Sequence, residues 1–343
     1  MKKAMFLFLL IPFFACQNQS NKNNTAGEET IKDNVVNVQS LIELGREKQY
    51  VEMTGVSSKN PVLLFLHGGP GWPKTPYLRY FNTDLTKSVT LVSWDQAGCG
   101  KSYMHNPHPK NLSLEQLVQD AHELTQVLKK KFQQDKIYLA GFSWGTVLGM
   151  HLINKYPEDY AAYFGISQII DIGKSIVVSR DWIKQQAKLK KDKQMLKRVA
   201  LLENNDTSFC KTTLDCFFKK YEMLTEYGGA IYSKEAEAEI KIAESKYDDY
   251  KNYDWLKGFF YSASRLGNTI FETDFTGITE LKVPVYFFVG RHDQSLPAMV
   301  TEDFYNKLKA PKKEMVWFEG SGHEPLEEEP GNFNKAVIAR IKN

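Results

Sequence analysis

A serine between two glycines is the residue whose surroundings most clearly predict chemistry. Ser143 is the third residue of the segment GFSWG, at 141–145, which follows an apolar stretch and precedes a helix-forming one. Such glycines permit a sharp turn from strand to helix, which strains the serine backbone and points its hydroxyl out of the sheet. The context predicts that Ser143 is a nucleophile and not an inert serine in a glycine-rich turn.

A serine nucleophile needs a general base, and chains with this turn carry an acid and then a histidine further along. His323 lies in the segment GSGHEP and Asp293 in GRHD, each just past an apolar stretch. Both therefore lie at carboxyl ends of predicted strands, the sheet edge where α/β sites assemble. We expect His323 to be the base and Asp293 to orient it. His292, Glu319 and Glu324 are nearby alternatives for the base or the acid. His292 adjoins Asp293 and would point elsewhere, and Glu319 precedes the flexible glycine turn.

The glycine-rich segment HGGPG, which follows the apolar stretch 62–66, predicts half of an oxyanion hole. Its glycines let a backbone N–H approach a substrate oxygen, and its proline stiffens the loop. We expect one N–H from Gly69, with Gly68 as the alternative, and the other from Trp144, the residue after the nucleophile. We expect His67 to brace this loop and not to act as a second base.

These groups together predict acyl transfer. The serine attacks a carbonyl while His323 takes its proton, two N–H groups hold the oxyanion, and water then hydrolyses the acyl-enzyme. This chemistry needs no metal and no organic cofactor, and the other histidines show no H-E-x-x-H or comparable ligand spacing. We therefore predict no cofactor and no metal site.

Strands and helices alternate in the sequence around these residues. Ser113 and Gln116 resemble a capping box that starts a helix with apolar residues at helical spacing. The alternation predicts an α/β fold with a mostly parallel, doubly wound sheet. Strands are predicted at 62–66, 89–94, 136–140, 283–289 and 314–318.

The pattern changes between about residues 170 and 266, which are charged, aromatic and helix-prone without a buried-strand run. We expect a helical cap at 169–265, inserted into a core made of residues 35–168 and 266–343. The cysteines Cys210 and Cys216 lie six residues apart within the cap. An exported protein could join them, but spacing alone leaves a disulfide and two free thiols equally open.

The first sixteen residues have the composition of an export signal. Two lysines precede the apolar run 4–14, which is too short to span a bilayer. The small residue alanine followed by Cys16 at the end of this run resembles the lipobox of bacterial lipoproteins. We expect a signal peptide at 1–16, lipid on Cys16, and a disordered tether at 17–34, where polar residues dominate. The protein would then be exported and membrane-anchored, facing the periplasm or the cell surface. Ordinary secretion and a chance cysteine are the alternatives.

The composition is that of a globular protein, with 42% hydrophobic and 25% charged residues in a chain of 343. Lys and Arg number 44 against 41 Asp and Glu, a formal net charge of +3. This near balance gives no reason to expect a nucleic-acid partner, and no feature implies a protein partner.

With these residues in view, the chain resembles the proline iminopeptidase family of α/β-hydrolases. The similar segments are HGGPG, WDQAGCGKS at 94–102, the serine turn, and the Gly-x-x-Asp and Gly-x-x-His turns. The resemblance covers residues 48–166 and 281–332. It implies the α/β-hydrolase fold, a helical cap over the pocket, and an aminopeptidase that releases N-terminal residues from small peptides.

In that family carboxylates of the cap bind the free amine of the substrate, and Glu222 and Glu226 could take this role here. The chain departs from the family pattern at Ala97, where arginine is usual, and at Phe142, where many members have a second glycine. An ester, lactone or amide hydrolase with the same three residues is therefore an alternative. A non-catalytic binding lipoprotein is a second one, since a fold does not fix a function.

Overall fold

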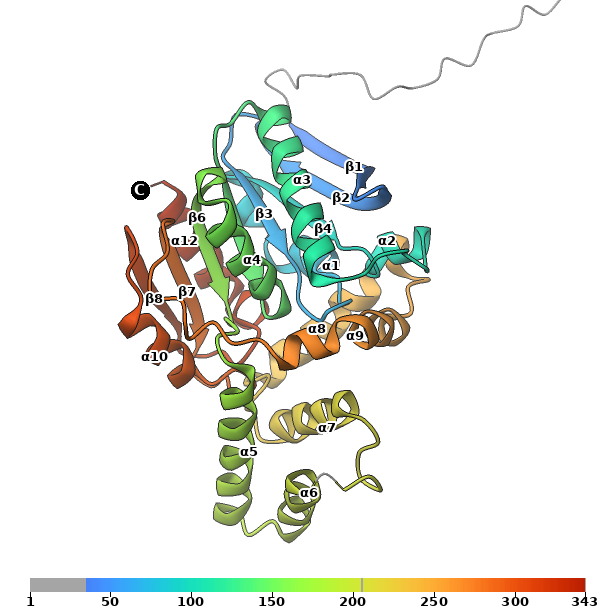
Figure 1. Ribbon diagram of the computed structural model, residues 1–343, viewed down its shortest axis with the longest axis vertical. Coiled ribbons are helices and arrows are strands. Elements are labelled where there is room, and N and C mark those ends of the chain that lie inside the picture. Colours follow the sequence, from blue (N-terminus) through green and yellow to red (C-terminus); the bar gives the residue numbers. More distant parts are fainter. Residues whose placement is uncertain (1–34, 205, 343) are drawn as a thin grey trace, which may run out of the picture.

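The computed structural model describes residues 35–204 and 206–342. Within them an eight-stranded sheet is formed by β1 (Val36–Leu44), β2 (Glu47–Gly55), β3 (Val62–Leu66), β4 (Thr90–Asp95), β5 (Ile137–Phe142), β6 (Tyr160–Ile166), β7 (Val285–Gly290) and β8 (Lys313–Phe318). The strands lie in the order β1-β2-β4-β3-β5-β6-β7-β8 (Figure 1). β2 pairs antiparallel with β1 and with β4, and the other neighbouring strands are parallel.

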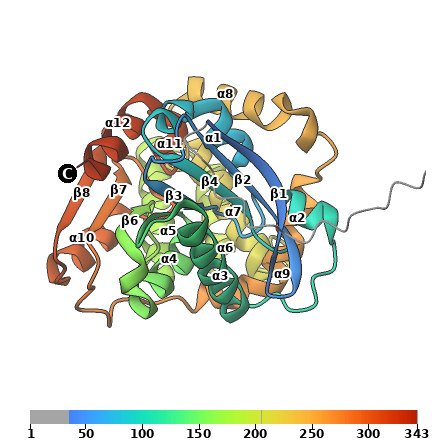
Figure 2. The same ribbon diagram turned by 90° about the horizontal axis from the view of Figure 1, so that it is seen from above.

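Helices cover both faces of this sheet (Figure 2). Its own helices are α1 (Thr75–Phe81), α2 (Gly100–His105), α3 (Leu114–Phe132), α4 (Trp144–Lys155), α10 (Ala298–Lys307), α11 (Pro325–Glu328) and α12 (Pro330–Ile341). Apolar residues of α3, α4 and α10 pack on one face, and those of α1 and α12 on the other. Because side chains alternate along a strand, Leu64 and Leu66 of β3 join the first cluster, whereas Leu63 and Phe65 join the second.

The strands predicted from apolar runs are present with small shifts. β3 has the predicted bounds, and β5 continues two residues beyond the prediction, up to Phe142. The Ser113 side chain accepts a hydrogen bond from the Gln116 N–H (3.2 Å), which confirms the predicted helix start. β1, β2 and β6 were not predicted.

The segment between β6 and β7 is here called the cap. Its α-helices, within the described residues, are α5 (Ile172–Leu189), α6 (Lys193–Glu203), α7 (Thr213–Glu226), α8 (Lys234–Lys246) and α9 (Trp255–Phe271). α8 and α9 lie across one end of the sheet, and α5, α6 and α7 extend away from it (Figure 1). The expected cap boundary at residue 265 falls inside α9, because Leu266 and Ile270 continue that helix and pack into the core. A disulfide joins Cys210 to Cys216, with Cα atoms 5.1 Å apart.

Buried tyrosines connect the cap to the loops at the carboxyl edge of the sheet. The Tyr250 hydroxyl donates to Asp95 Oδ2 (2.7 Å), and the Tyr253 hydroxyl donates to the carbonyl of Gly71 (2.7 Å). The second bond ties the cap directly to the HGGPG loop. The cap is therefore positioned over the strand ends by specific contacts with the segments that carry the predicted chemistry.

The predicted signal peptide, Cys16 and the tether lie outside the described residues. Within 35–204 and 206–342, no helix has both the length and the apolar character needed to cross a membrane.

Candidate active site

The turn around Ser143 has the backbone that the GFSWG segment predicts. Ser143 lies between β5 and α4 with φ 48° and ψ −116°, a conformation that is costly for any residue with a Cβ. A Cβ at Gly141 would lie 2.6 Å from the carbonyl oxygen of Gly145. A Cβ at Gly145 would collide with the carbonyl oxygen of Leu66. The two glycines are therefore required by close backbone contacts, and the turn points the serine into a cavity.

His323 and Asp293 are held together at the ends of β8 and β7. His323 Nδ1 lies 2.9 Å from Asp293 Oδ2, and Oδ1 of the same carboxylate accepts the N–H groups of Ser295 (2.8 Å) and Leu296 (2.9 Å). Both side chains are almost completely buried. Because Asp293 occupies Nδ1, the other ring nitrogen of His323, Nε2, is the one available to accept a proton.

Burial and the Asp293 charge act in opposite directions on His323. Burial alone would lower the pKa of His323, but the charge of Asp293 and its hydrogen bond outweigh burial and raise that pKa. The imidazolium that forms when the histidine takes a proton is therefore stabilised by the carboxylate.

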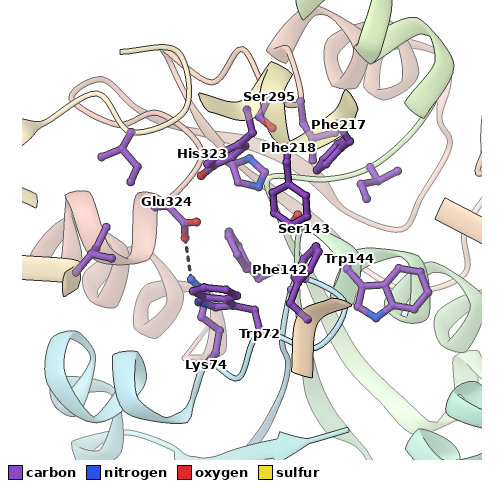
Figure 3. A pocket seen from close by; sticks show the side chains of 18 of the residues that line it. Trp72, Lys74, Phe142, Ser143, Trp144, Phe217, Phe218, Ser295, His323 and Glu324 are labelled. Atoms are coloured by element: carbon purple, nitrogen blue, oxygen red, sulfur yellow. Dashed lines mark hydrogen bonds and ion pairs between the residues drawn. The ribbon is translucent and has the colours of Figure 1, made fainter. Parts of the chain in front are cut away.

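The turn that carries His323 is joined to the serine turn through the end of β6. The Ser143 N–H donates to the carbonyl of Ile166 (3.0 Å), and the next residue, Ser167, donates its hydroxyl to the carbonyl of His323 (2.7 Å). Ser143 and His323 line the same cavity (Figure 3). The structure thus brings the three predicted residues to one place, with Asp293 behind the histidine.

The competing titratable residues have other contacts. Glu319 is exposed and pairs with Arg291 through two hydrogen bonds of 2.7 and 2.9 Å. His292 stacks on Tyr232 with ring centroids 3.6 Å apart. Glu324 lines the cavity but pairs with a lysine. None of the three hydrogen-bonds His323 in the described part of the chain.

The HGGPG loop and the first residue of α4 also face the cavity. Gly68, Gly69 and Trp144 line it. Gly69 has φ 108°, and a Cβ there would lie 2.7 Å from the N atom of Gly71, so only glycine fits. The first N–H groups of a helix have no acceptor within the helix, which leaves that of Trp144 for a ligand. These positions suit the two expected oxyanion donors.

His67 braces this loop. The N–H of Gln96 donates to His67 Nε2 (3.1 Å), so Nδ1 carries the proton and donates to the carbonyl of Gly68 (2.7 Å). Burial lowers the pKa of His67 to about 4, which keeps the ring neutral, as this pattern requires. The Gln96 side chain accepts from Trp144 Nε1 (3.2 Å), so one residue connects the loop to the serine turn. The sequence did not predict this role for Gln96.

The cavity has a volume of about 340 Å³, within the range of small-molecule sites. Most of its lining is aromatic or aliphatic. Four carboxyl side chains and two lysines also reach it: Glu237, Glu244, Glu324, Glu327, Lys74 and Lys241. None of these six was predicted to bind substrate.

Lys74, Glu324 and Glu327 form a buried cluster beside the histidine. Lys74 Nζ lies 2.7 Å from Glu324 and 2.6 Å from Glu327 (Figure 3 shows the first pair). Burial raises the pKa of Glu327 well above its usual value, whereas the Lys74 charge outweighs burial at Glu324 and lowers its pKa. The Lys74 charge thus favours the charged form of Glu324, whereas burial favours the neutral form of Glu327.

Glu244 on α8 is different. It accepts a hydrogen bond from the Tyr77 hydroxyl (2.6 Å), which in turn accepts from Trp72 Nε1 (2.8 Å). Glu237 has Lys241 as its partner at 2.8 Å, but no described cation pairs with Glu244. Glu244 therefore takes part in no ion pair among the described residues, although its charge contributes to raising the pKa of Lys241, which also lines the cavity.

The predicted amine-binding residues are placed elsewhere. Glu222 and Glu226 are both exposed on α7 and do not line the cavity, and Glu226 pairs with Arg198 at 2.6 Å. The reason is helical geometry, since residues four apart share a face. The face of α7 that lines the cavity carries Phe217, Phe218 and Tyr221.

Within residues 35–204 and 206–342, no group of three or more His, Cys, Asp or Glu residues is arranged to hold a metal ion.

Comparison with known proteins identifies the family. The family described as serine aminopeptidase, S33, matches residues 57–330, which include Ser143, Asp293 and His323. The chain belongs to the serine aminopeptidase S33 family. It is accordingly a hydrolase, and the resemblance to proline iminopeptidases is confirmed by relatives of that name.

Two relatives and one solved structure illustrate the likeness of this member of the family to known proteins. Probable aminopeptidase YbaC of Bacillus subtilis (strain 168) is 29% identical over 311 residues, which span 88% of this chain and 95% of that protein. Proline iminopeptidase of Heyndrickxia coagulans is 27% identical over 286 residues, spanning 82% and 90%. A proline iminopeptidase-related protein of Thermus thermophilus has a TM-score of 0.63 at 18% identity, covering 90% and 98%. This structural likeness confirms the α/β-hydrolase fold.

Proposed function

We propose that this protein is a serine aminopeptidase of the proline iminopeptidase type, which releases N-terminal residues from small peptides through an acyl-enzyme. The observation that carries the proposal is the carboxylate of Glu244, without an ion-pair partner among the described residues, in the cavity that Ser143 and His323 line. A cavity with a nucleophile and a carboxylate that takes part in no described ion pair suits a substrate with a protonated amine close to its scissile carbonyl.

The mechanism follows from the contacts of the three residues. Ser143 Oγ attacks the carbonyl carbon while its proton moves to Nε2 of His323, because Asp293 holds Nδ1. The N–H groups of Gly69 and Trp144 stabilise the oxyanion. The intermediate collapses as His323 returns the proton to the leaving amine, and water activated by the same histidine then hydrolyses the ester bond to Ser143.

Binding of the free amine is assigned to Glu244. In a cavity lined by aromatic side chains the local dielectric is low, so the attraction between an ammonium and a carboxylate is stronger than in water. Tyr77 fixes the Glu244 side chain by its hydrogen bond. The amine would thereby hold the first residue of the peptide with its carbonyl near Ser143.

We predict that Glu244→Gln raises KM for aminoacyl-naphthylamides with a free amine by about tenfold to hundredfold, the loss of one charge-assisted contact. The same change should leave KM for N-acetylated amides and p-nitrophenyl esters nearly unaltered, because they lack the ammonium. Both series can be measured by steady-state kinetics on the same protein. Glu235→Gln, an exposed change at the start of α8, is the matched control.

Equal effects on free and blocked substrates would make Glu244 a structural residue. If Glu222→Gln or Glu226→Gln raised KM for free amines instead, the expectation from the sequence would replace this assignment. If no free-amine substrate were turned over while esters or lactones were, the same three residues would serve an ester, lactone or amide hydrolase. A protein that hydrolyses neither would be a binding lipoprotein.

We propose further that the protein is exported and carries lipid on Cys16. The first sixteen residues support this, and so does the Cys210–Cys216 disulfide, since such bonds persist in oxidising compartments. In cells fed labelled palmitate, the full chain should incorporate label and fractionate with membranes, and Cys16→Ser should do neither. Wild type without label would leave plain secretion.

A further inference from the structure

A second cavity, of about 530 Å³, lies within the cap between α5, α6, α7 and α9. Of the described residues that line it, three are cationic and none is acidic: Arg180, Lys211 and Lys220. The wall also includes Thr212 and Thr213, which start α7. The first N–H groups of a helix and its dipole favour a bound anion, although this feature alone does not make a site.

Lys220 provides evidence for an anion site that does not depend on the helix N-terminus. This residue on α7 is 3% exposed, and its Nζ has no hydrogen-bond partner among the described residues. The ammonium lies 5.0 Å from the centroid of the Phe217 ring. Burial lowers the pKa of Lys220 to about 8, against the opposing charge of Asp293, so the ammonium is still mostly protonated at neutral pH. A buried cation without a hydrogen-bonded anion is costly, and a bound anion would offset that cost.

Arg180 on α5 also supports an anion site in this cavity. Its buried Nε also has no hydrogen-bond partner among the described groups. The nearest carboxylate, that of Glu203, lies 3.8 Å from Nε and is bound more closely by Lys184 at 2.8 Å. Two cations from different helices of the cap thus have unused donors at one cavity.

The second cavity adjoins the active-site cavity. Phe217 and Phe271 line both, and their rings contact each other edge to face with centroids 6.0 Å apart. These two side chains form a partition, with Ser143 and Glu244 on one side and Arg180 and Lys220 on the other. A negative group beside these cations would therefore be separated from Glu244 by the partition, although the charge of Asp293 also acts on Lys220.

We propose that the second cavity binds a small carboxylate, held by Lys220 and Arg180. The carboxylate could belong to the C-terminus of a peptide whose first residue occupies the active site, or to a separate organic acid. Binding of a peptide C-terminus at this cavity rests on the proposed aminopeptidase function. Binding of a separate organic acid does not rest on it.

Calorimetric titration of the full chain carrying Ser143→Ala tests this site without turnover. The probes are succinate, the tripeptide Pro-Gly-Gly, and its C-terminal amide. We expect Lys220→Met in this background to weaken binding of the carboxylate probe by about tenfold or more, as for loss of one charge-assisted hydrogen bond. Lys197→Met, an exposed change on α6 with the same loss of charge, should leave binding unaltered. Arg180→Gln provides a second variant if Lys220→Met does not fold.

The probes separate the two sources. A tripeptide acid that binds at least tenfold more tightly than its amide, with the difference lost in Lys220→Met, identifies the substrate carboxylate. Succinate binding that depends on Lys220, with acid and amide bound equally, identifies a separate organic acid. If none of the three probes binds in a way that depends on Lys220 or Arg180, the proposal is overturned. The naphthylamide kinetics still decide the aminopeptidase function independently.

Discussion

Replacing Ser143 with alanine is expected to lower kcat by a factor of about 10⁴ or more, because the nucleophile is lost. His323→Ala should be equally severe, since the same proton transfer fails. Alanine keeps the Cβ of serine and adds no atoms to the turn at φ 48°, so the fold should be retained. Steady-state kinetics on the best substrate measure the rates, and circular dichroism with thermal melting checks the fold. Ser264→Ala, an exposed change on α9, is the matched control.

Covalent labelling gives a second measurement that does not need a known substrate. A fluorophosphonate should modify wild type and the Ser264→Ala protein at Ser143, and fail to modify Ser143→Ala. Turnover within tenfold of wild type after Ser143→Ala, together with labelling at another serine, would refute the assigned nucleophile.

Asp293→Asn is expected to lower kcat by about 10⁴, as for an enzyme whose histidine is held in the wrong tautomer. An asparagine can present an N–H to Nδ1, which would leave the proton on the nitrogen that must accept one. Glu319→Gln is the matched control, because Glu319 is exposed and paired with Arg291. It should change kcat by less than about twofold. Near-normal rates in Asp293→Asn with a large loss in Glu319→Gln would reverse the assignment of the acid.

The pH dependence of kcat/KM should also differ between wild type and Asp293→Asn. The base must be neutral to act, so kcat/KM rises as the pH increases through the pKa of His323 in the free enzyme. Asp293 raises that pKa above its usual value, and burial opposes it. Removing the Asp293 charge leaves burial, so the acid limb of the profile should move to lower pH in Asp293→Asn. A limb that stays in place would mean that Asp293 does not set the protonation of the base.

Local sequence was sufficient for the strands that are apolar throughout. β3, with the sequence VLLFL, is buried on both faces, and a run of five apolar residues predicts that directly. The hairpin of β1 and β2 was missed although every second residue of β1 is exposed and the residues between are less exposed, a pattern of period two. β6 was missed because its run, YAAYFGI, follows a helix closely and contains small residues that give no clear strand signal.

The sequence by itself determined the turns that carry the proposed chemistry. Gly141 and Gly145 around Ser143, and Gly69 in the HGGPG loop, meet requirements of backbone geometry that act over a few residues, so their identities reveal the turn. The order of serine, acid and histidine along the chain, each after a strand, then placed the groups at one edge of the sheet.

The tertiary structure alone decided which charged side chains reach the cavities. Glu244 lines the cavity of Ser143, Glu222 faces solvent, and Lys220 is buried at a second cavity. All three residues nevertheless lie on amphipathic helices of the same cap. A helical sequence fixes which residues share a face, but the direction of that face depends on packing between helices far apart in the chain. The buried pairing of Lys74 with Glu324, residues 250 positions apart, likewise follows from the approach of two loops that no local pattern encodes.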